Sequence, residues 1–301
     1  MSQGSTGDRG RGSAGRGQPL VPMLHLDTLW FQVSGTICNL RCTHCFISCA
    51  PDNHSHGMMS LQEVRRFLDE ATRLGVREYY FTGGEPFMNR EFLRILEETL
   101  DVGPATVLTN GLFLDPRRCR RLREMADAGE YSLEIRVSLD GWGPADHDAI
   151  RGPGTFRRTL EGIRNLWEFR LNPVITITEA VQGVACGDGR ARFLSLLRSF
   201  GLSRPRLKIL PLLRIGAEEA RTRGYEPWER LTADAVTPEG LASLQCSCCR
   251  MVTSRGVYVC PILIEEPRAR MGSSIAETLR PFELAHSACY TCYARGLTCT
   301  T

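Results

Sequence analysis

The sequence has no long apolar run and little net charge. No stretch approaches the roughly 18 apolar residues of a membrane span, and residues 1–20 contain no apolar segment of the kind found in signal peptides. The net charge is +3, and three arginines against one aspartate place +2 of it in the first twenty residues. We therefore expect a cytoplasmic protein without a membrane anchor and without a nucleic-acid partner.

Cysteine, by contrast, is abundant. The chain holds 13 cysteines, and in the reducing cytoplasm they are not expected to form disulfides. Eleven of them fall in two groups, one between residues 38 and 49 and the other between residues 246 and 299. Clustered thiols in such a compartment indicate metal or iron–sulfur ligation.

The apolar pattern predicts an alternation of strands and helices. Residues 1–22 lack apolar periodicity and are predicted to be a disordered tail. Beyond them, six strands alternate with five helices, which is typical of a parallel α/β sheet or barrel. The predicted strands are 29–33, 78–82, 106–109, 132–139, 174–178 and 207–210, and the predicted helices are 61–74, 90–100, 116–128, 155–169 and 190–200. The first cysteine group directly follows the first strand, so we expect it at the carboxyl ends of the strands, where such folds carry their working loops.

One strand alternates cleanly between an apolar and a polar face. Three aliphatic residues would pack on the helices, while the other face carries Glu134, Arg136, Ser138 and Asp140. The inner face of a closed eight-stranded barrel is expected to be aliphatic. The polar face therefore predicts an incompletely closed barrel with a wet interior that holds a ligand.

The composition changes after residue 216. We predict a core domain over residues 23–216, a linker with a short helix over 217–245, and a small cysteine-rich subdomain over 246–301. Thr237 and Pro238 are typical of a helix N-cap and first helical position. The last segment carries seven cysteines and few long elements, so it is expected to need a metal or cluster to fold.

The first cysteine group contains the pattern Cys38-x3-Cys42-x2-Cys45. Zinc usually takes four ligands in two paired arms, whereas three thiolates from one loop can hold a [4Fe–4S] cube and leave its fourth iron open to a substrate or cofactor. Further motifs follow the later strands. Together with this cysteine pattern, they make residues 27–215 resemble the radical S-adenosylmethionine (SAM) superfamily. These motifs are Phe81-Thr82-Gly83-Gly84-Glu85-Pro86, Thr109-Asn110-Gly111, Ser138-Leu139-Asp140-Gly141 and Arg151-Gly152-Pro153-Gly154-Thr155-Phe156.

The resemblance implies an α/β fold, a partial (β/α)6 TIM barrel, with a [4Fe–4S] cluster and SAM as cofactors. The three cysteines Cys38, Cys42 and Cys45 would hold the cluster, and SAM would occupy its fourth iron. The residues expected to contact SAM are His44, Gly83, Gly84, Glu85, Ser138, Asp140 and Arg151. Cys49 lies outside the three-ligand pattern and is expected to be a free thiol. A low-potential reductant such as flavodoxin or ferredoxin is implied as a partner.

The C-terminal cysteines resemble the auxiliary-cluster segment known as SPASM, or its shortened form, the twitch. The resemblance implies one auxiliary [4Fe–4S] cluster, because adjacent Cys248 and Cys249 can hardly both face one cube. Its ligands would be Cys246, Cys260, Cys289 and Cys292, with Cys299 as a possible substitute. A structural zinc site with the same four thiolates is the alternative.

The resemblance implies an enzyme that cleaves SAM reductively to a 5′-deoxyadenosyl radical and abstracts a substrate hydrogen. Modification of a peptide or protein is the leading expectation, with radical oxidation of a small metabolite as the alternative. A non-catalytic iron–sulfur electron carrier or binding protein is the alternative from another class. The polar residues Glu134, Arg136 and Lys208 are candidates for substrate contact or proton removal; each could instead belong to an internal ion pair.

Overall fold

The computed structural model describes residues 17–296, and its centre is one nine-stranded sheet in the order β10-β9-β8-β2-β3-β4-β5-β6-β7. The six strands from β2 to β7 are parallel to one another, as the sequence predicts. They are β2 (Thr28–Gln32), β3 (Glu78–Thr82), β4 (Ala105–Thr109), β5 (Leu133–Ser138), β6 (Val174–Thr178) and β7 (Arg206–Leu210). The predicted strands match them to within one residue at each end.

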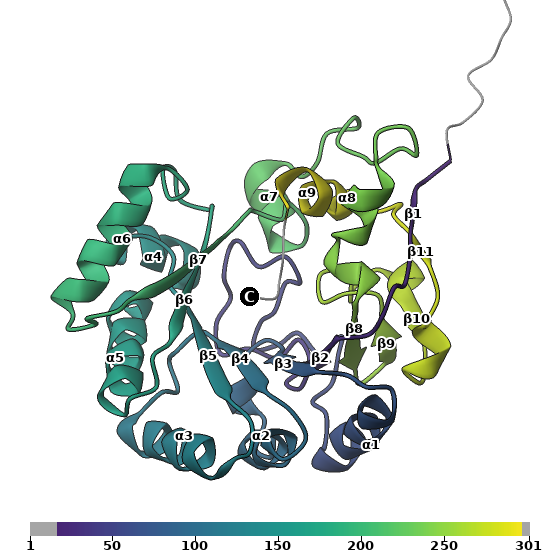
Figure 1. The fold of residues 1–301 in the computed structure, drawn as a ribbon. Coiled ribbons are helices and arrows are strands. Elements are labelled where there is room, and N and C mark those ends of the chain that lie inside the picture. Colours follow the sequence, from purple (N-terminus) through teal and green to yellow (C-terminus); the bar gives the residue numbers. More distant parts are fainter. Residues whose placement is uncertain (1–16, 297–301) are drawn as a thin grey trace, which may run out of the picture.

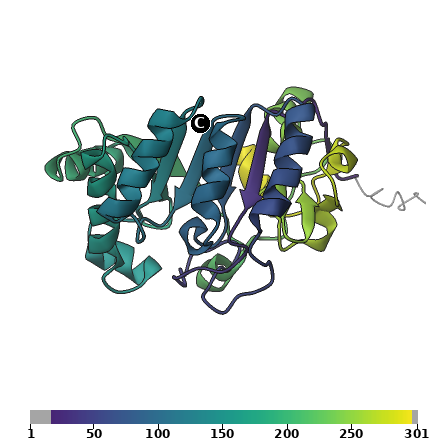
Figure 2. The ribbon, with the colours of Figure 1, turned by 90° about the horizontal axis from the view of Figure 1, so that it is seen from below.

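Helices cover the outer face of this sheet (Figures 1 and 2). They are α1 (Leu61–Arg73), α2 (Phe92–Leu100), α3 (Pro116–Ala128), α5 (Thr155–Glu168) and α6 (Gly187–Ser199). Ser60 and Glu63 form a complete capping box at the start of α1, and Asp115 caps α3 ahead of Pro116. A helix that the sequence did not predict, α4 (Pro144–Arg151), lies between β5 and α5.

The sheet curves into an open arc whose concave face encloses the loop after β2 (Figure 1). Aliphatic side chains such as Ile135, Val137 and Leu139 pack in the core between sheet and helices. The residues that alternate with them face the concave side, as the predicted polar face requires. The fold is therefore the expected open partial barrel.

The cysteine-rich segment after residue 245 extends the main sheet. Strand β8 (Cys249–Thr253) pairs in parallel with β2, and β9 (Gly256–Tyr258) and β10 (Arg270–Gly272) follow in antiparallel order. The predicted subdomain over residues 246–301 stays a prediction, and its strands β8, β9 and β10 continue the main sheet. Because β8 is buried along its whole length, its sequence shows no alternation that would have marked it as a strand.

The N-terminal segment also needs a correction. The predicted disordered tail extends to residue 22, but β1 (Leu20–Val21) pairs antiparallel with β11 (Phe282–Glu283). The rest of that tail, residues 1–16, and Cys299 lie outside the described residues. The remaining helices are α7 (Ala217–Thr222), α8 (Pro238–Ala242), α9 (Ala288–Arg295) and the 3-10 turns Pro86–Met88, Gln245–Ser247, Pro267–Ala269 and Ala276–Thr278. Thr237 caps α8 as predicted.

Candidate functional site

The first cysteine group lies in a loop fixed across the mouth of the arc. The Cys38 amide donates to the Ala50 carbonyl at 3.1 Å, and the Thr43 amide donates to the Ile150 carbonyl at 2.9 Å. The Ala217 amide at the start of α7 donates to the Cys45 carbonyl at 3.0 Å. The loop is therefore held from both sides, so its thiols have defined positions.

A cavity of about 230 Å³ lies between this loop and the carboxyl ends of the strands. Soft thiol donors gather on one wall, and apolar side chains, glycine backbone and a few basic side chains complete the lining. The predicted residues that line it are Cys38, Cys42, Cys45, His44, Gly83, Gly84, Ser138, Arg136, Arg151 and Lys208. Three thiols of one loop, facing a space of this size, fit a group larger than a single metal ion.

The two glycines after β3 permit close contact between the strand end and the cysteine loop. A Cβ atom on Gly84 would lie 2.1 Å from the Ile37 carbonyl oxygen and 2.7 Å from Cys38 Cβ. The Gly84 amide donates to the Gly35 carbonyl at 2.8 Å. The Gly-Gly pair is thus needed to seat the loop, besides leaving backbone exposed to the cavity.

We therefore expect Gly84→Ala to displace the cysteine loop. Overpacking of this kind lowers the free energy of unfolding by roughly 1–3 kcal/mol, and iron content after anaerobic reconstitution should fall with it. Gly187→Ala is the matched control, because a Cβ atom there meets nothing within 4 Å. Chemical denaturation and iron analysis measure both effects, and an unchanged Gly84→Ala protein would contradict the contact described above.

Glu85 lies behind the cavity wall. Its carboxylate accepts from Thr109 Oγ1 at 2.8 Å, from the Asn110 amide at 2.8 Å and from the Phe87 amide at 3.2 Å. Burial raises the pKa of Glu85 to about 7. In this arrangement the carboxylate ties the ends of β3 and β4 together and is absent from the cavity lining, although the sequence predicts a contact with SAM.

Asp140 is a fully buried carboxylate that orders two cavity residues. Its Oδ2 atom lies 2.9 Å from His44 Nε2 and accepts from Arg151 Nε at 2.6 Å. Its Oδ1 atom accepts from Thr178 Oγ1 at 2.7 Å. Burial alone would raise the pKa of Asp140, but Arg151 and His44 hold it well below its usual range. Asp140 therefore positions His44 and Arg151, and the ion pair that it forms with Arg151 is buried.

Cys49 also lies in this cavity, close to Cys45. Its amide donates to Cys45 Sγ at 3.3 Å. The neighbouring Cys49 thiol and this amide lower the pKa of Cys45. The sequence left Cys49 without a role, and the structure shows it as a hydrogen-bond donor to one of the three loop thiols.

The three candidate substrate-contact residues separate in the structure. Glu134 is outside the cavity lining. It forms ion pairs with Arg136 Nε at 2.8 Å and with Arg206 Nη2 at 2.5 Å. This is the internal ion pair that the sequence analysis gave as the alternative to a substrate contact. Arg136 and Lys208 line the cavity. The Arg136 guanidinium also lies 5.2 Å from the centre of the Tyr80 ring.

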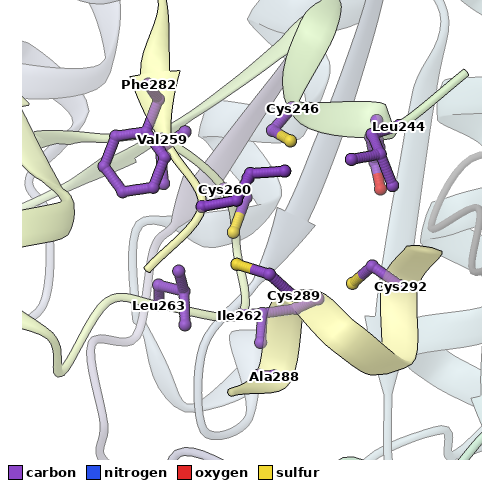
Figure 3. Close-up of a pocket in the computed structure, with 12 residues that line it drawn as sticks. Leu244, Cys246, Val259, Cys260, Ile262, Leu263, Phe282, Ala288, Cys289 and Cys292 are labelled. Atoms are coloured by element: carbon purple, nitrogen blue, oxygen red, sulfur yellow. The ribbon is translucent and has the colours of Figure 1, made fainter. Parts of the chain in front are cut away.

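A second cavity of about 30 Å³ lies among the C-terminal elements. The thiols of Cys246, Cys260, Cys289 and Cys292 point toward one shared space in it, between aliphatic side chains (Figure 3). Neither Cys248 nor Cys249 lines this cavity. Four soft donors in an apolar shell suit iron–sulfur or zinc chemistry. Within residues 17–296, no group of three or more His, Cys, Asp or Glu side chains is arranged to hold a single metal ion.

Several cavity residues escaped the sequence reasoning. Trp30 and Gln32 on β2 and Thr176 and Thr178 on β6 line the first cavity. On β6, the threonines alternate with Ile175 and Ile177. The same period-2 pattern that identified the polar face of β5 was therefore present there. On β2, Thr28 and Gln32 also alternate with Leu29 and Phe31, so the same pattern was available although every residue of the strand is buried.

The open α/β barrel with a three-thiol loop at its mouth defines an iron–sulfur protein of the partial-barrel class. Residues 33–181 match the radical SAM superfamily, and the chain belongs to that superfamily. Membership implies a [4Fe–4S] cluster and SAM as cofactors, and the thiol-lined cavity is suited to them.

Two curated relatives share about a third of their aligned residues with the chain. An AdoMet-dependent heme synthase of Methanosarcina barkeri is 34% identical over 46% of this chain and 40% of its own. A GTP 3′,8-cyclase of Pectobacterium atrosepticum is 33% identical over 50% of this chain and 46% of its own. The chain thus spans less than half the length of these relatives.

Among solved structures, native anSMEcpe with bound AdoMet has a TM-score of 0.62 at 15% identity, over 88% of this chain and 82% of its own. The same protein with bound AdoMet and the Cp18Cys peptide has a TM-score of 0.57 at 16% identity, over 83% of this chain and 79% of its own. This likeness confirms the partial-barrel fold. None of the helices in residues 17–296 has the length and apolar character needed to span a membrane.

Proposed function

We propose that this chain is a radical SAM enzyme that removes a hydrogen atom from an organic substrate in the cavity at the mouth of the barrel. The observation that supports this proposal most is that Cys38, Cys42 and Cys45 line one cavity, together with Gly83, Gly84 and Arg151. The three thiolates would hold a [4Fe–4S] cluster, and SAM would complete the coordination of its fourth iron. When bound, the cluster supplies the electron that cleaves SAM to methionine and a 5′-deoxyadenosyl radical, which abstracts the hydrogen.

The chain's own residues bind and orient SAM in this proposal. Gly83 and Gly84 present backbone groups beside the loop, and Arg151 lies with its Nη1 atom 4.0 Å from Cys42 Sγ, where it can receive the SAM carboxylate. His44 and Ser138 line the same cavity, and Asp140 fixes His44 and Arg151 from behind. Glu85 supports the loop that carries the two glycines. A low-potential reductant such as flavodoxin or ferredoxin would supply the electron.

Cys246, Cys260, Cys289 and Cys292 would hold one auxiliary [4Fe–4S] cluster, as in a twitch-like segment. Their convergence on one apolar space, with Cys248 and Cys249 outside it, supports a single cluster. Cys299, the substitute named from the sequence, lies outside the described residues. Iron and sulfide analysis distinguishes this cluster from zinc: the proposal expects about eight irons per chain, and zinc with about four irons would overturn it.

A peptide or protein is the leading substrate class. The peptide-bound anSMEcpe structure shows that a protein of this fold can admit a peptide beside AdoMet. A small metabolite is the second candidate, favoured by the names of the curated relatives, which describe heme synthesis and GTP cyclisation. Mass spectrometry of peptide and metabolite pools after turnover, with the loss of hydrogen as the expected change, separates the two.

Anaerobic reconstitution followed by dithionite and SAM tests the enzyme proposal. We expect chromatography to detect 5′-deoxyadenosine that depends on both additions. Its absence from protein with a full cluster content would favour the non-catalytic alternative, an iron–sulfur electron carrier or binding protein.

A change at Cys49 should alter the SAM-binding cluster without removing it. Cys49→Ala deletes the thiol beside Cys45 Sγ, so we expect a midpoint potential roughly 65–130 mV more negative, since a hydrogen bond to a charged group is worth roughly 1.5–3 kcal/mol. Cys49→Ser keeps a donor and is the matched control. EPR-monitored redox titration measures both, and equal potentials in wild type and Cys49→Ala would refute this role.

A further inference from the structure

Arg250 on β8 is a cation that the fold buries completely. Its side chain is 1% exposed. Every hydrogen bond that it forms within residues 17–296 goes to a backbone carbonyl, and none goes to a carboxylate. A buried charge without a counter-ion is strongly destabilising, so a negative group is expected close to it.

Five hydrogen bonds hold the guanidinium in place. Nε and Nη2 donate to the Thr278 carbonyl at 3.0 and 2.9 Å, and Nη2 also donates to the Arg280 carbonyl at 3.1 Å. Nη1 donates to the carbonyls of Cys246 and Cys249 at 2.8 and 2.6 Å. All N–H groups of the side chain are thus paired. The carbonyls satisfy these donors, but they leave the positive charge without a counter-ion.

The second thiol-lined cavity begins at one of these contacts. Cys246 accepts from Arg250 through its carbonyl, and its thiol points into the space that it shares with Cys260, Cys289 and Cys292 (Figure 3). Among the described residues that line this cavity, none is lysine or arginine. The lining itself therefore offers no cation that could balance ionised thiols.

Electrostatic attraction couples Arg250 to this thiol set. Burial lowers the pKa of Arg250, and the thiolates of Cys249, Cys246 and Cys260 raise it. Four thiolates around a doubly charged metal core leave a site with an excess of negative charge. In an apolar cavity that excess needs a counter-charge, as the buried guanidinium does. Each of the two unbalanced charges can therefore balance the other.

We infer that Arg250 is the counter-charge of the auxiliary thiolate site, where it stabilises the metal-loaded state and raises the reduction potential of the cluster. This inference rests on the proposed function, because it assigns a residue to the proposed auxiliary site. Arg250 is not a ligand, since it lies outside the cavity lining and reaches Cys246 through the backbone. A nearby cation stabilises the reduced cluster more than the oxidised one, because reduction adds a negative charge. The same cation favours the ionised thiols that any metal at this site requires.

Redox titration of the full chain with its clusters reconstituted tests this inference. The auxiliary cluster is followed by the EPR signal that does not change when SAM is added. Arg250→Gln should make its midpoint potential more negative, so that the ratio of reduced to oxidised cluster at a fixed applied potential falls ~10-fold or more. Arg250→Lys keeps the positive charge but loses part of the hydrogen-bonding fork. It should unfold at a lower denaturant concentration than the wild type and keep the wild-type potential.

Arg255→Gln is the matched control, because it removes the same charge from an exposed position in the turn between β8 and β9. Its potential should equal that of the wild type. Equal potentials in wild type and Arg250→Gln would overturn the inference. If Arg250→Gln does not fold, Arg250→Lys still decides, because a potential that falls together with its stability would leave Arg250 with a structural role alone.

Metal analysis separates this result from the outcome for the proposed function. A loaded auxiliary cluster whose potential does not respond to Arg250→Gln overturns this inference alone. Zinc in place of the cluster contradicts the proposed cluster alone, and the inference is then tested by the time for which zinc is retained against EDTA. Arg250→Gln should shorten that time ~10-fold or more, and Arg250→Lys and Arg255→Gln should not. Thiols that bind neither metal would overturn both.

Discussion

Cys42→Ala abolishes SAM cleavage and removes about four irons per chain, if the SAM-binding cluster is held as proposed. The physical reason is that three thiolates are the minimum set for a cube whose fourth iron stays open. With one thiolate gone, the loop offers two ligands beside a SAM-sized space. Iron analysis and 5′-deoxyadenosine chromatography measure the two losses, and the auxiliary cluster should retain the remaining iron.

Cys248→Ala is the control for this change. Cys248 belongs to neither thiol-lined cavity, and its thiol donates to the Gln245 carbonyl at 3.5 Å. Its removal should leave both iron content and 5′-deoxyadenosine formation at wild-type levels. Full iron content and activity in Cys42→Ala would show that the loop does not hold the cluster.

Asp140→Asn is expected to cause the largest loss of stability. The substitution leaves the buried Arg151 guanidinium without its carboxylate, and breaking a buried ion pair costs about 3–5 kcal/mol. His44 loses its partner at the same time, so SAM affinity should fall as well. Denaturant unfolding and SAM titration measure the two effects. Asp127→Asn, on the exposed pair with Arg123, is the control and should change stability by about 0.5 kcal/mol or less.

The difference in unfolding free energy between wild type and Asp140→Asn should depend on pH in a defined direction. The pKa of Asp140 is held well below its usual range in the folded protein, so its contribution to stability is present above the unfolded-state pKa of about 3.9. The contribution is lost as the pH falls toward the folded-state value. The stability gap between wild type and Asp140→Asn should therefore narrow below about pH 4, and a gap that widens there would contradict the assignment.

The sequence was sufficient for the parallel part of the fold because each strand and helix there carries its own period. The Ser60 capping box and the strand at Glu134–Ser138 are local patterns, and both agree with the structure. Strand β8, which lies inside the sheet between β9 and β2, was missed because its residues are buried on both faces, which removes the alternation. The pairing of β1 with β11 joins residues more than 250 positions apart, and two-residue strands carry no period.

The same distinction separates the site residues. The three-thiol loop and Gly83-Gly84 are contiguous motifs, and they meet at one cavity as the motif order predicts. The partners of the two buried carboxylates were not predicted. Glu85 accepts hydrogen bonds from Thr109 and Asn110, and Asp140 accepts one from Arg151. Spacing along the chain does not determine these partners, because they depend on the register between neighbouring strands.

The most direct test of the account is electron–nuclear double resonance on the reduced, reconstituted protein with SAM labelled in its carboxylate with 17O. If Cys38, Cys42 and Cys45 hold a cluster with an open iron, hyperfine coupling between the cluster and the labelled carboxylate will be observed. It will disappear in Cys42→Ala. A fully loaded wild-type protein whose cluster spectrum shows no coupling to the label would contradict the central claim.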